Sequence, residues 1–262
     1  MVTIFVIMTA TLLLSHVAPF PFVLDVTSNS VSLWRVKEPP GRKVVYLSYD
    51  DGPNPRVTPR LLDLLRDKEA HATFFVIPER VTADTAPIVR RMFEEGHTVG
   101  LHSADRRLAS KGQDRIIARL QAGSAHIELM TGRRPAPLFR PHAGFRSVAM
   151  ITGLRQLGYR LVGWSFMSWD WVWFRRRTGE RVASQILAHV APGKIIVIHD
   201  SHHSDPRADR DYAIEATRLI VDGLRRKGYE TALLSEPPEE TGENRGDSPV
   251  SRIPVPPPVR LR

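Results

Sequence analysis

A regular alternation of strand and helix signals between residues 43 and about 235 is the strongest constraint on the fold of this chain. Short apolar runs that predict buried strands cover 44–48, 72–77, 97–102, 137–140, 160–165, 194–199 and 229–234. Segments with helical periodicity separate them, at 58–69, 84–95, 110–131, 147–157, 180–190 and 209–227. Repeated βα units predict parallel strands joined by right-handed connections. Seven strands are one fewer than a complete eightfold barrel has, so we expect a distorted (β/α) barrel, with an open doubly wound sheet as the alternative.

Composition limits the chemistry that is open to this chain. The 262 residues contain no cysteine, so any metal must be held by histidines and carboxylates. The net charge is +9, but the basic residues are not gathered in one tract. We therefore expect a solvated basic surface and no nucleic-acid partner.

The two ends of the chain differ in composition from its middle. Residues 1–24 are mostly apolar and carry no Asp, Glu, Lys or Arg, which predicts a signal peptide or a membrane anchor. A buried first element is the alternative. Residues 25–42 are expected to form a linker, 43–236 a single domain, and the Pro-rich residues 237–262 a disordered tail. We expect export, with the protein secreted or anchored to the outer face of the cytoplasmic membrane.

Polar, chemically active side chains follow the ends of several predicted strands. Because the carboxyl ends of parallel strands meet at one rim of a barrel, we expect these side chains to lie together. They are Asp50 and Asp51, His102, Arg140, Asp170 and His199.

Two adjacent carboxylates at a strand end cannot both be buried and ionised without compensation. A divalent cation, such as zinc with a histidine as a further ligand, would remove this conflict for one of them and leave the other as a free base. His199 could protonate a leaving group, and Arg140 could hold the base. Together these groups predict metal-assisted hydrolysis of an amide or ester.

Five stretches then resemble, in order, the motifs of the polysaccharide deacetylase family, also known as the NodB-homology domain or carbohydrate esterase family 4. They are "LSYDDGP", "GLHSADR", "FRPHAG", "WSFMSWDW" and "IIVIHD". The resemblance spans about residues 43 to 236 and implies a distorted (β/α)7 barrel. It also implies removal of N-acetyl or O-acetyl groups from peptidoglycan, chitin-like sugars or xylan, with zinc or a similar divalent metal as cofactor and an N-acetylated glycan as substrate.

The resemblance assigns a role to each matching position. It makes Asp50 the general base, Arg140 the residue that orients this base, and His199 the general acid. It makes Asp51 and His102 metal ligands. It makes Asp170, with the neighbouring Trp171, the pair that tunes the catalytic histidine.

The second motif departs from the family's pattern. The family usually places a second histidine four residues after the first, and this chain has Arg106 there. Asp105 lies three residues after His102 and is a candidate replacement ligand; the alternative is that it caps or pairs with Arg106 or Arg107. His202 and His203, in "HDSHHSD", are further candidates, although a polar surface loop is the simpler interpretation.

The third motif is also altered, because His142 and Ala143 stand where the family often has Pro and Tyr. The N–H of Ala143 could still stabilise an oxyanion, since a backbone group does not depend on the side chain. His142 is either a substrate contact or a loop residue. Two alternative functions follow from these departures: a non-catalytic glycan-binding relative with a degenerate metal site, or a small-molecule amide or imide hydrolase of the same fold.

Overall fold

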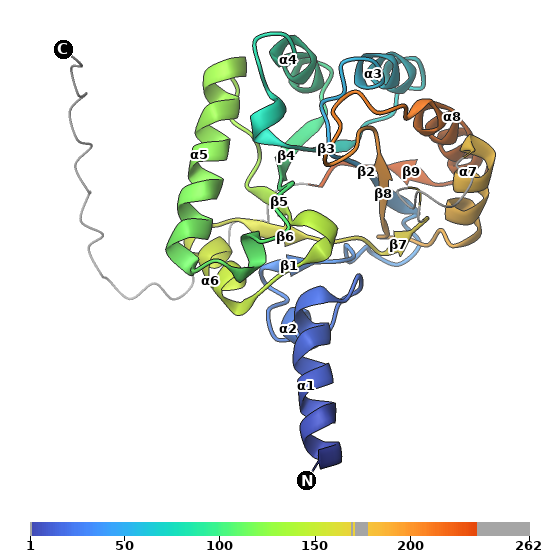
Figure 1. Ribbon diagram of the computed structural model, residues 1–262. Helices are drawn as coiled ribbons and strands as arrows, with labels where there is room; N and C mark the ends of the chain where they lie inside the picture. Colours follow the sequence, from blue (N-terminus) through green and yellow to red (C-terminus); the bar gives the residue numbers. More distant parts are fainter. Residues whose placement is uncertain (1, 169, 171–177, 235–262) are drawn as a thin grey trace, which may run out of the picture.

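A single curled sheet of parallel strands forms the centre of the computed structural model, which describes residues 2–168, 170 and 178–234 (Figure 1). Its strands are β1 (Ser32–Leu33), β2 (Val44–Asp50), β3 (Thr73–Val76), β4 (Thr98–His102), β5 (Leu138–Arg140), β6 (Arg160–Val162), β7 (Phe166–Met167), β8 (Ile195–His199) and β9 (Glu230–Thr231). They follow the order β1-β6-β5-β4-β3-β2-β8-β7, and β9 pairs with β2 off this path.

Helices cover the outside of the curled sheet (Figure 1). They are α3 (Thr58–Asp67), α4 (Ala86–Glu94), α5 (Gln113–Thr131), α6 (Val148–Leu157), α7 (Gly179–Ala188) and α8 (Asp211–Arg226). Two further helices precede the sheet in the sequence, α1 (Val2–Val17) and α2 (Val23–Val26). Three short 3-10 helices lie in the connections: η1 (Pro78–Arg80), η2 (Leu108–Ser110) and η3 (His142–Gly144).

The predicted barrel class is confirmed, and the strand pairing shows how the barrel is distorted. β1 and β7 are the two ends of the strand order, so no ladder closes the sheet there in the described part of the chain. The Ser165 hydroxyl instead donates to the Trp34 carbonyl, and an isolated antiparallel bridge joins Arg35 to Lys194. The predicted strand 160–165 ends at Val162, and only Glu230–Thr231 of the predicted strand 229–234 is extended.

Strand β2 is the longest strand of the described sheet and is buried throughout. All seven of its residues are buried, because it lies between β3 and β8 and has helices outside it. Its register places Asp50 opposite His199 on one side and Phe75 on the other. On the next strands, His102 of β4 lies opposite Arg140 of β5. The sheet register therefore brings the predicted reactive residues to one rim.

Residues 25–42 were expected to be a linker, and this prediction is wrong for the first part of the segment. β1 pairs in parallel with β6, which makes it an edge strand of the barrel. The Trp34 ring is buried against Trp164 with ring centroids 5.7 Å apart. A side chain at Gly163 would overlap the Trp34 ring, since its Cβ would lie 2.2 Å from a ring atom. The domain therefore begins well before residue 43.

Helix α1 extends away from the barrel as an isolated rod (blue in Figure 1). Its apolar side chains are mostly exposed. Within residues 2–168, 170 and 178–234, no helix combines the length and the apolar character that a membrane crossing requires. The predicted tail 237–262 lies outside the described residues.

The burial of Trp34 gives a direct test of the corrected boundary. We expect Trp34→Ala to lower the free energy of unfolding by about 3–5 kcal/mol, because it leaves a cavity between the sheet edge and Trp164. Leu129→Ala, at an exposed leucine of α5, is the matched control and should change stability by less than about 0.5 kcal/mol. Thermal and denaturant unfolding measure both values; equal stability of the two variants would restore the linker interpretation.

Candidate active site

The rim formed by the carboxyl ends of β2, β4, β5 and β8 gathers most of the predicted site residues. Asp50, His102, Arg140 and His199 are the last residues of these four strands. Asp51 follows β2 directly, and Asp170 reaches the same rim through contacts with His199. Trp171 lies outside the described residues.

Arg140 is a fully buried cation in the middle of this rim. Its Nη1 donates to Asp50 Oδ1 at 2.6 Å and to the Ser48 hydroxyl at 2.8 Å. Its Nε and Nη2 donate to the carbonyls of Val162 and Gly163. A buried guanidinium is costly unless its donors are satisfied, and these four bonds supply that compensation. Asp50 is thereby fixed in position, as expected for a base held by Arg140.

The backbone turns sharply between the two aspartates. Neighbouring residues of a strand point to opposite faces, but Asp51 leaves the extended region with φ of 73°. Such a conformation is uncommon for a residue with a side chain and typically occurs at functional sites. The half-buried Arg80 donates to the Asp51 carbonyl at 2.6 Å, which supports the turn. The carboxylates of Asp50 and Asp51 can therefore contact different partners.

Asp51 and His102 form the second pair of the site, with Oδ1 and Nε2 3.2 Å apart. His102 Nδ1 lies 2.8 Å from the Arg140 carbonyl. A carbonyl oxygen only accepts, so the hydrogen of a neutral imidazole lies on Nδ1 and Nε2 directs a lone pair toward the carboxylate. Two buried lone-pair donors that face each other fit a divalent cation as two protein ligands.

Burial would raise the pKa of the Asp51 carboxyl, but other groups outweigh it. When His102 Nε2 carries a proton instead, its hydrogen bond and charge, together with the charges of His199 and Arg80, hold this pKa well below its usual range. Asp51 is therefore an anion at neutral pH, which is the form that binds a metal.

The predicted replacement ligand Asp105 does not join this pair. Its side chain is exposed, and its carboxylate accepts the N–H of Arg107 at 2.8 Å, a local turn that holds it away from the rim. Arg106, at the position of the family's histidine, donates to His203 Nε2 at 3.0 Å. Among the described residues no three His, Asp or Glu side chains are placed to share one metal ion.

The altered third motif forms η3, beside the Asp51–His102 pair. Ala143 has φ of 50°, a left-handed conformation that Gly144 continues. The His142 ring lies 4.9 Å from that of His203, centroid to centroid. Burial, and then the nearby His102 and His203, lower the pKa of His142 to about 4, so His142 is neutral at pH 7.

His199 and Asp170 form the third pair. His199 Nδ1 lies 3.0 Å from Asp170 Oδ1, and the His199 N–H donates to Oδ2 at 2.9 Å. Tyr212 adds a hydroxyl to the same carboxylate at 3.1 Å. Burial alone would lower the pKa of His199, but the carboxylates of Asp170, Asp51 and Asp50 raise it to about 9. His199 is therefore protonated at neutral pH.

Arg80 and Asp200 are two site residues that the sequence analysis did not assign. Arg80 is the last residue of η1, the 3-10 turn that follows β3, so inspecting the last residues of the strands did not find it. Asp200 is fully buried, bonded to the Thr58 hydroxyl and close to Gly52, where a Cβ would lie 2.9 Å from the carboxylate. Burial, and then the charge of Asp51, raise the pKa of Asp200 to about 7.

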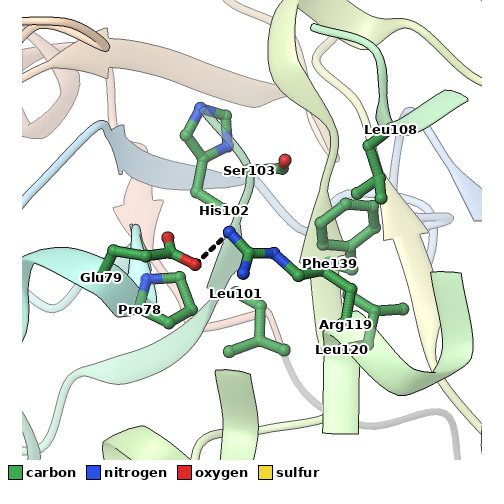
Figure 2. A pocket seen from close by; sticks show the side chains of 9 residues that line it. All are labelled: Pro78, Glu79, Leu101, His102, Ser103, Leu108, Arg119, Leu120 and Phe139. Atoms are coloured by element: carbon green, nitrogen blue, oxygen red, sulfur yellow. Dashed lines mark ion pairs between the residues drawn. The ribbon is translucent and has the colours of Figure 1, made fainter. Parts of the chain in front are cut away.

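A small cavity lies on the α5 side of His102, as Figure 2 shows. The side chains of Leu101, Leu108 and Phe139 line it, and an ion pair between Glu79 and Arg119 lies beside them. Its volume of about 20 Å³ is that of roughly one water molecule. It is too small for a sugar ring.

Comparison with known proteins identifies the family. The model for polysaccharide deacetylases matches residues 37–162. A peptidoglycan-N-acetylglucosamine deacetylase of Bacillus cereus is 30% identical over 204 residues, which cover 78% of this chain and 91% of that protein. A chitooligosaccharide deacetylase of a Bradyrhizobium species is 30% identical over 211 residues, covering 75% of this chain and 91% of the relative.

A solved structure agrees with these sequence matches. A family 4 acetyl xylan esterase from Clostridium thermocellum, solved in complex with a cobalt ion, has a TM-score of 0.65 and 31% identity, covering 73% of this chain and 88% of that one. The chain belongs to the polysaccharide deacetylase family, and its fold is the distorted (β/α)7 barrel expected from the resemblance.

The environment of His199 yields a prediction about its titration. We expect Asp170→Asn to lower the pKa of His199 from about 9 toward the ordinary histidine value of about 6.5, because the variant removes the closest negative charge and keeps the side-chain shape. NMR titration of the imidazole protons measures it, with His199→Ala assigning the resonance. Asp67→Asn, at an exposed aspartate of α3, is the control; a His199 pKa that Asp170→Asn does not lower contradicts the assignment.

Proposed function

We propose that this protein is a hydrolase that removes acetyl groups from an N-acetylated cell-envelope glycan, such as peptidoglycan or a chitin-like oligosaccharide. The observation that carries the proposal is the convergence of three pairs on one rim: Asp50 with Arg140, Asp51 with His102, and His199 with Asp170. The relatives named above act on such glycans, and this supports the substrate class.

In the proposed reaction, Asp50 accepts a proton from the attacking water. Arg140 holds Asp50 Oδ1 at 2.6 Å, so the carboxylate keeps one orientation toward the rim. The water oxygen bonds to the acetyl carbonyl carbon. The N–H of Ala143 is the proposed donor to the oxygen that becomes negative, because η3 lies beside the metal-ligand pair.

His199 then completes the reaction as general acid. It donates its proton to the sugar nitrogen as the C–N bond breaks, so the products are acetate and a free amino sugar. Asp170 keeps His199 oriented and protonated through the two bonds it makes with the imidazole and the backbone. His142 and Trp171 are the further candidate substrate contacts of this proposal, and Trp171 is named from the sequence alone.

A divalent cation, zinc in this proposal, is the cofactor. Asp51 and His102 would hold it, and their facing lone pairs support this assignment. When bound, the cation would polarise the acetyl carbonyl as a Lewis acid. We do not include Asp105 as a third ligand in the proposal, because its carboxylate accepts the Arg107 N–H.

We also propose that the protein is exported. The apolar N-terminal residues 1–24 and the glycan substrates of the named relatives support this location. We propose the outer face of the cytoplasmic membrane as the location, because a glycan of the cell envelope is accessible there.

One observation favours a second candidate, a non-catalytic glycan-binding protein. Arg106 stands where the family has a metal ligand, and a cation there opposes a second cation. The retained Asp50–Arg140 and His199–Asp170 pairs favour the enzyme, because glycan binding alone requires neither a held base nor a raised histidine pKa.

Acetate release from chitooligosaccharides and from peptidoglycan tests the proposed function. We expect wild type to release acetate, and Asp50→Asn or His199→Ala to reduce kcat/KM by about 10²–10⁴-fold, since each removes one proton-transfer group. Asp67→Asn should keep full activity. Glycan binding by a wild type that releases no acetate would establish the second candidate, and turnover of small amides alone would identify a small-molecule hydrolase.

Metal analysis separates the proposed ligands. We expect zinc bound by the wild-type protein to be lost in Asp51→Ala and retained in Asp105→Ala, because only the first carboxylate faces His102. Elemental analysis and zinc titration calorimetry measure this without an activity assay. Loss of zinc in Asp105→Ala would show that the loop rearranges to supply a third ligand.

A further inference from the structure

The N-terminal segment is joined to the barrel by one fully buried arginine. Arg146 follows η3 by two residues, and its Nε and Nη2 contact both oxygens of Asp25 at 2.5–3.0 Å. Its remaining donors bond the carbonyls of Ala18 at 2.7 Å and Phe20 at 2.9 Å. Asp25 is itself 3% exposed. Both the ion pair and the carbonyl contacts come from residues 18–25, so this segment is part of the folded domain.

The same arginine also fixes the loop of the third motif. Arg146 Nη1 donates to the Gly144 carbonyl at 2.9 Å, and its backbone N–H donates to the His16 carbonyl of α1 at 2.9 Å. Its guanidinium lies over the Trp34 ring at 4.8 Å. The last turn of α1 and the loop η3 are therefore held by one residue. We call Arg146 and Asp25 the latch.

Beyond the latch, α1 exposes apolar side chains. The ten large apolar residues of Val2–Val17 that are exposed have between 41% and 78% of their surface accessible. They are Val2, Ile4, Phe5, Val6, Ile7, Met8, Leu12, Leu13, Leu14 and Val17. The segment contains no Asp, Glu, Lys or Arg. An apolar surface of this extent on a helix calls for a partner that covers it.

A lipid bilayer fits this helix better than a second protein does. A partner helix or a second copy covers one stripe, whereas the apolar residues of α1 include runs of consecutive positions, such as 4–8 and 12–14, that face every side. The net charge of +9 complements anionic lipid headgroups. At 16 residues α1 is about 24 Å long, which is enough to reach deep into the roughly 30 Å hydrocarbon core of a bilayer.

We propose that α1 is a retained helix that inserts into an anionic lipid bilayer, and that the latch fixes it to the loop η3. Export as a cleaved protein would remove the carbonyl acceptors at residues 16–20 that Arg146 binds. The barrel and its rim thereby keep a set orientation to the membrane. The consequence for catalysis rests on the proposed function, but lipid insertion and the latch do not.

Vesicle flotation of the full chain tests the insertion. We expect flotation with phosphatidylcholine vesicles and more with vesicles that also contain phosphatidylglycerol, and high salt should remove only the additional part. Phe5→Glu combined with Leu13→Glu should reduce the bound fraction at least about ten-fold, whereas Leu129→Glu, on exposed α5, should not. Binding to neither vesicle, binding abolished by salt, or a dimer formed through α1 would each overturn the proposal.

Intact mass of the protein recovered from the membranes of the expressing cells tests retention. Presence of the α1 residues supports the anchor, and loss of residues 1–24 overturns it. Neither measurement depends on acetate release, so failure here and failure of the proposed function are distinguishable.

Hydrogen exchange tests the latch. In Arg146→Lys, which keeps the charge but loses the forked geometry, we expect amides of residues 142–146 and 16–25 to exchange at least about ten-fold faster, with the β2 and β8 amides unchanged. Asp25→Asn should give the same pattern. Arg66→Lys, an exposed arginine of α3, is the control. Uniform acceleration throughout the barrel, or no change in the two segments, would overturn the coupling.

Discussion

The mouth of the barrel depends on the buried guanidinium of Arg140. A charge at this depth is stable only if every donor finds an acceptor, and its acceptors lie on two other elements: Ser48 and Asp50 on β2, and two carbonyls at the end of β6. Its own carbonyl accepts from His102 on β4. One side chain on β5 thus sets the position of the proposed base, and its backbone sets the tautomer of the proposed ligand. The hydrogen bonds that position the proposed catalytic groups are therefore also the bonds that join β5 to β2 and to the end of β6 on this side of the barrel.

Around that centre, neighbouring carboxylates have opposite titration behaviour because their partners differ. Asp51 faces His102 and the charges of His199 and Arg80, so its pKa is held low. Asp200 has a hydroxyl partner and lies near Asp51, so burial and repulsion raise its pKa to about 7. The positive φ at Asp51 turns its carboxylate away from the direction of Asp50 and toward a partner of its own, His102.

The sequence predicted the barrel and most of the rim because parallel strands bring their carboxyl ends together whatever the details of the loops. The sequence-based prediction failed for segments whose structure leaves no periodic pattern of apolar residues. The segment before residue 43 joins the sheet through a two-residue strand and a buried ion pair between Asp25 and Arg146, and neither leaves a periodic pattern. Asp105 has the spacing of a ligand, but the local bond to the Arg107 N–H decides its direction. Arg80 was missed because it contributes through a 3-10 turn after β3 rather than as the last residue of a strand.

At position 106 this chain has an arginine where the family usually has a metal-binding histidine. The two remaining candidate ligands, Asp51 and His102, keep the neighbouring groups that orient them. His102 is oriented by the Arg140 carbonyl, and Asp51 by the turn after β2 and by Arg80, so neither depends on the second-motif loop for its direction. Arg106 is itself engaged with His203 in an exposed position. Because ligands are aimed by the groups behind them, the loss of one ligand changes how tightly a cation is held more than where it is held. The arrangement of the acid and base groups and the affinity for the proposed cation are therefore separable properties in this chain.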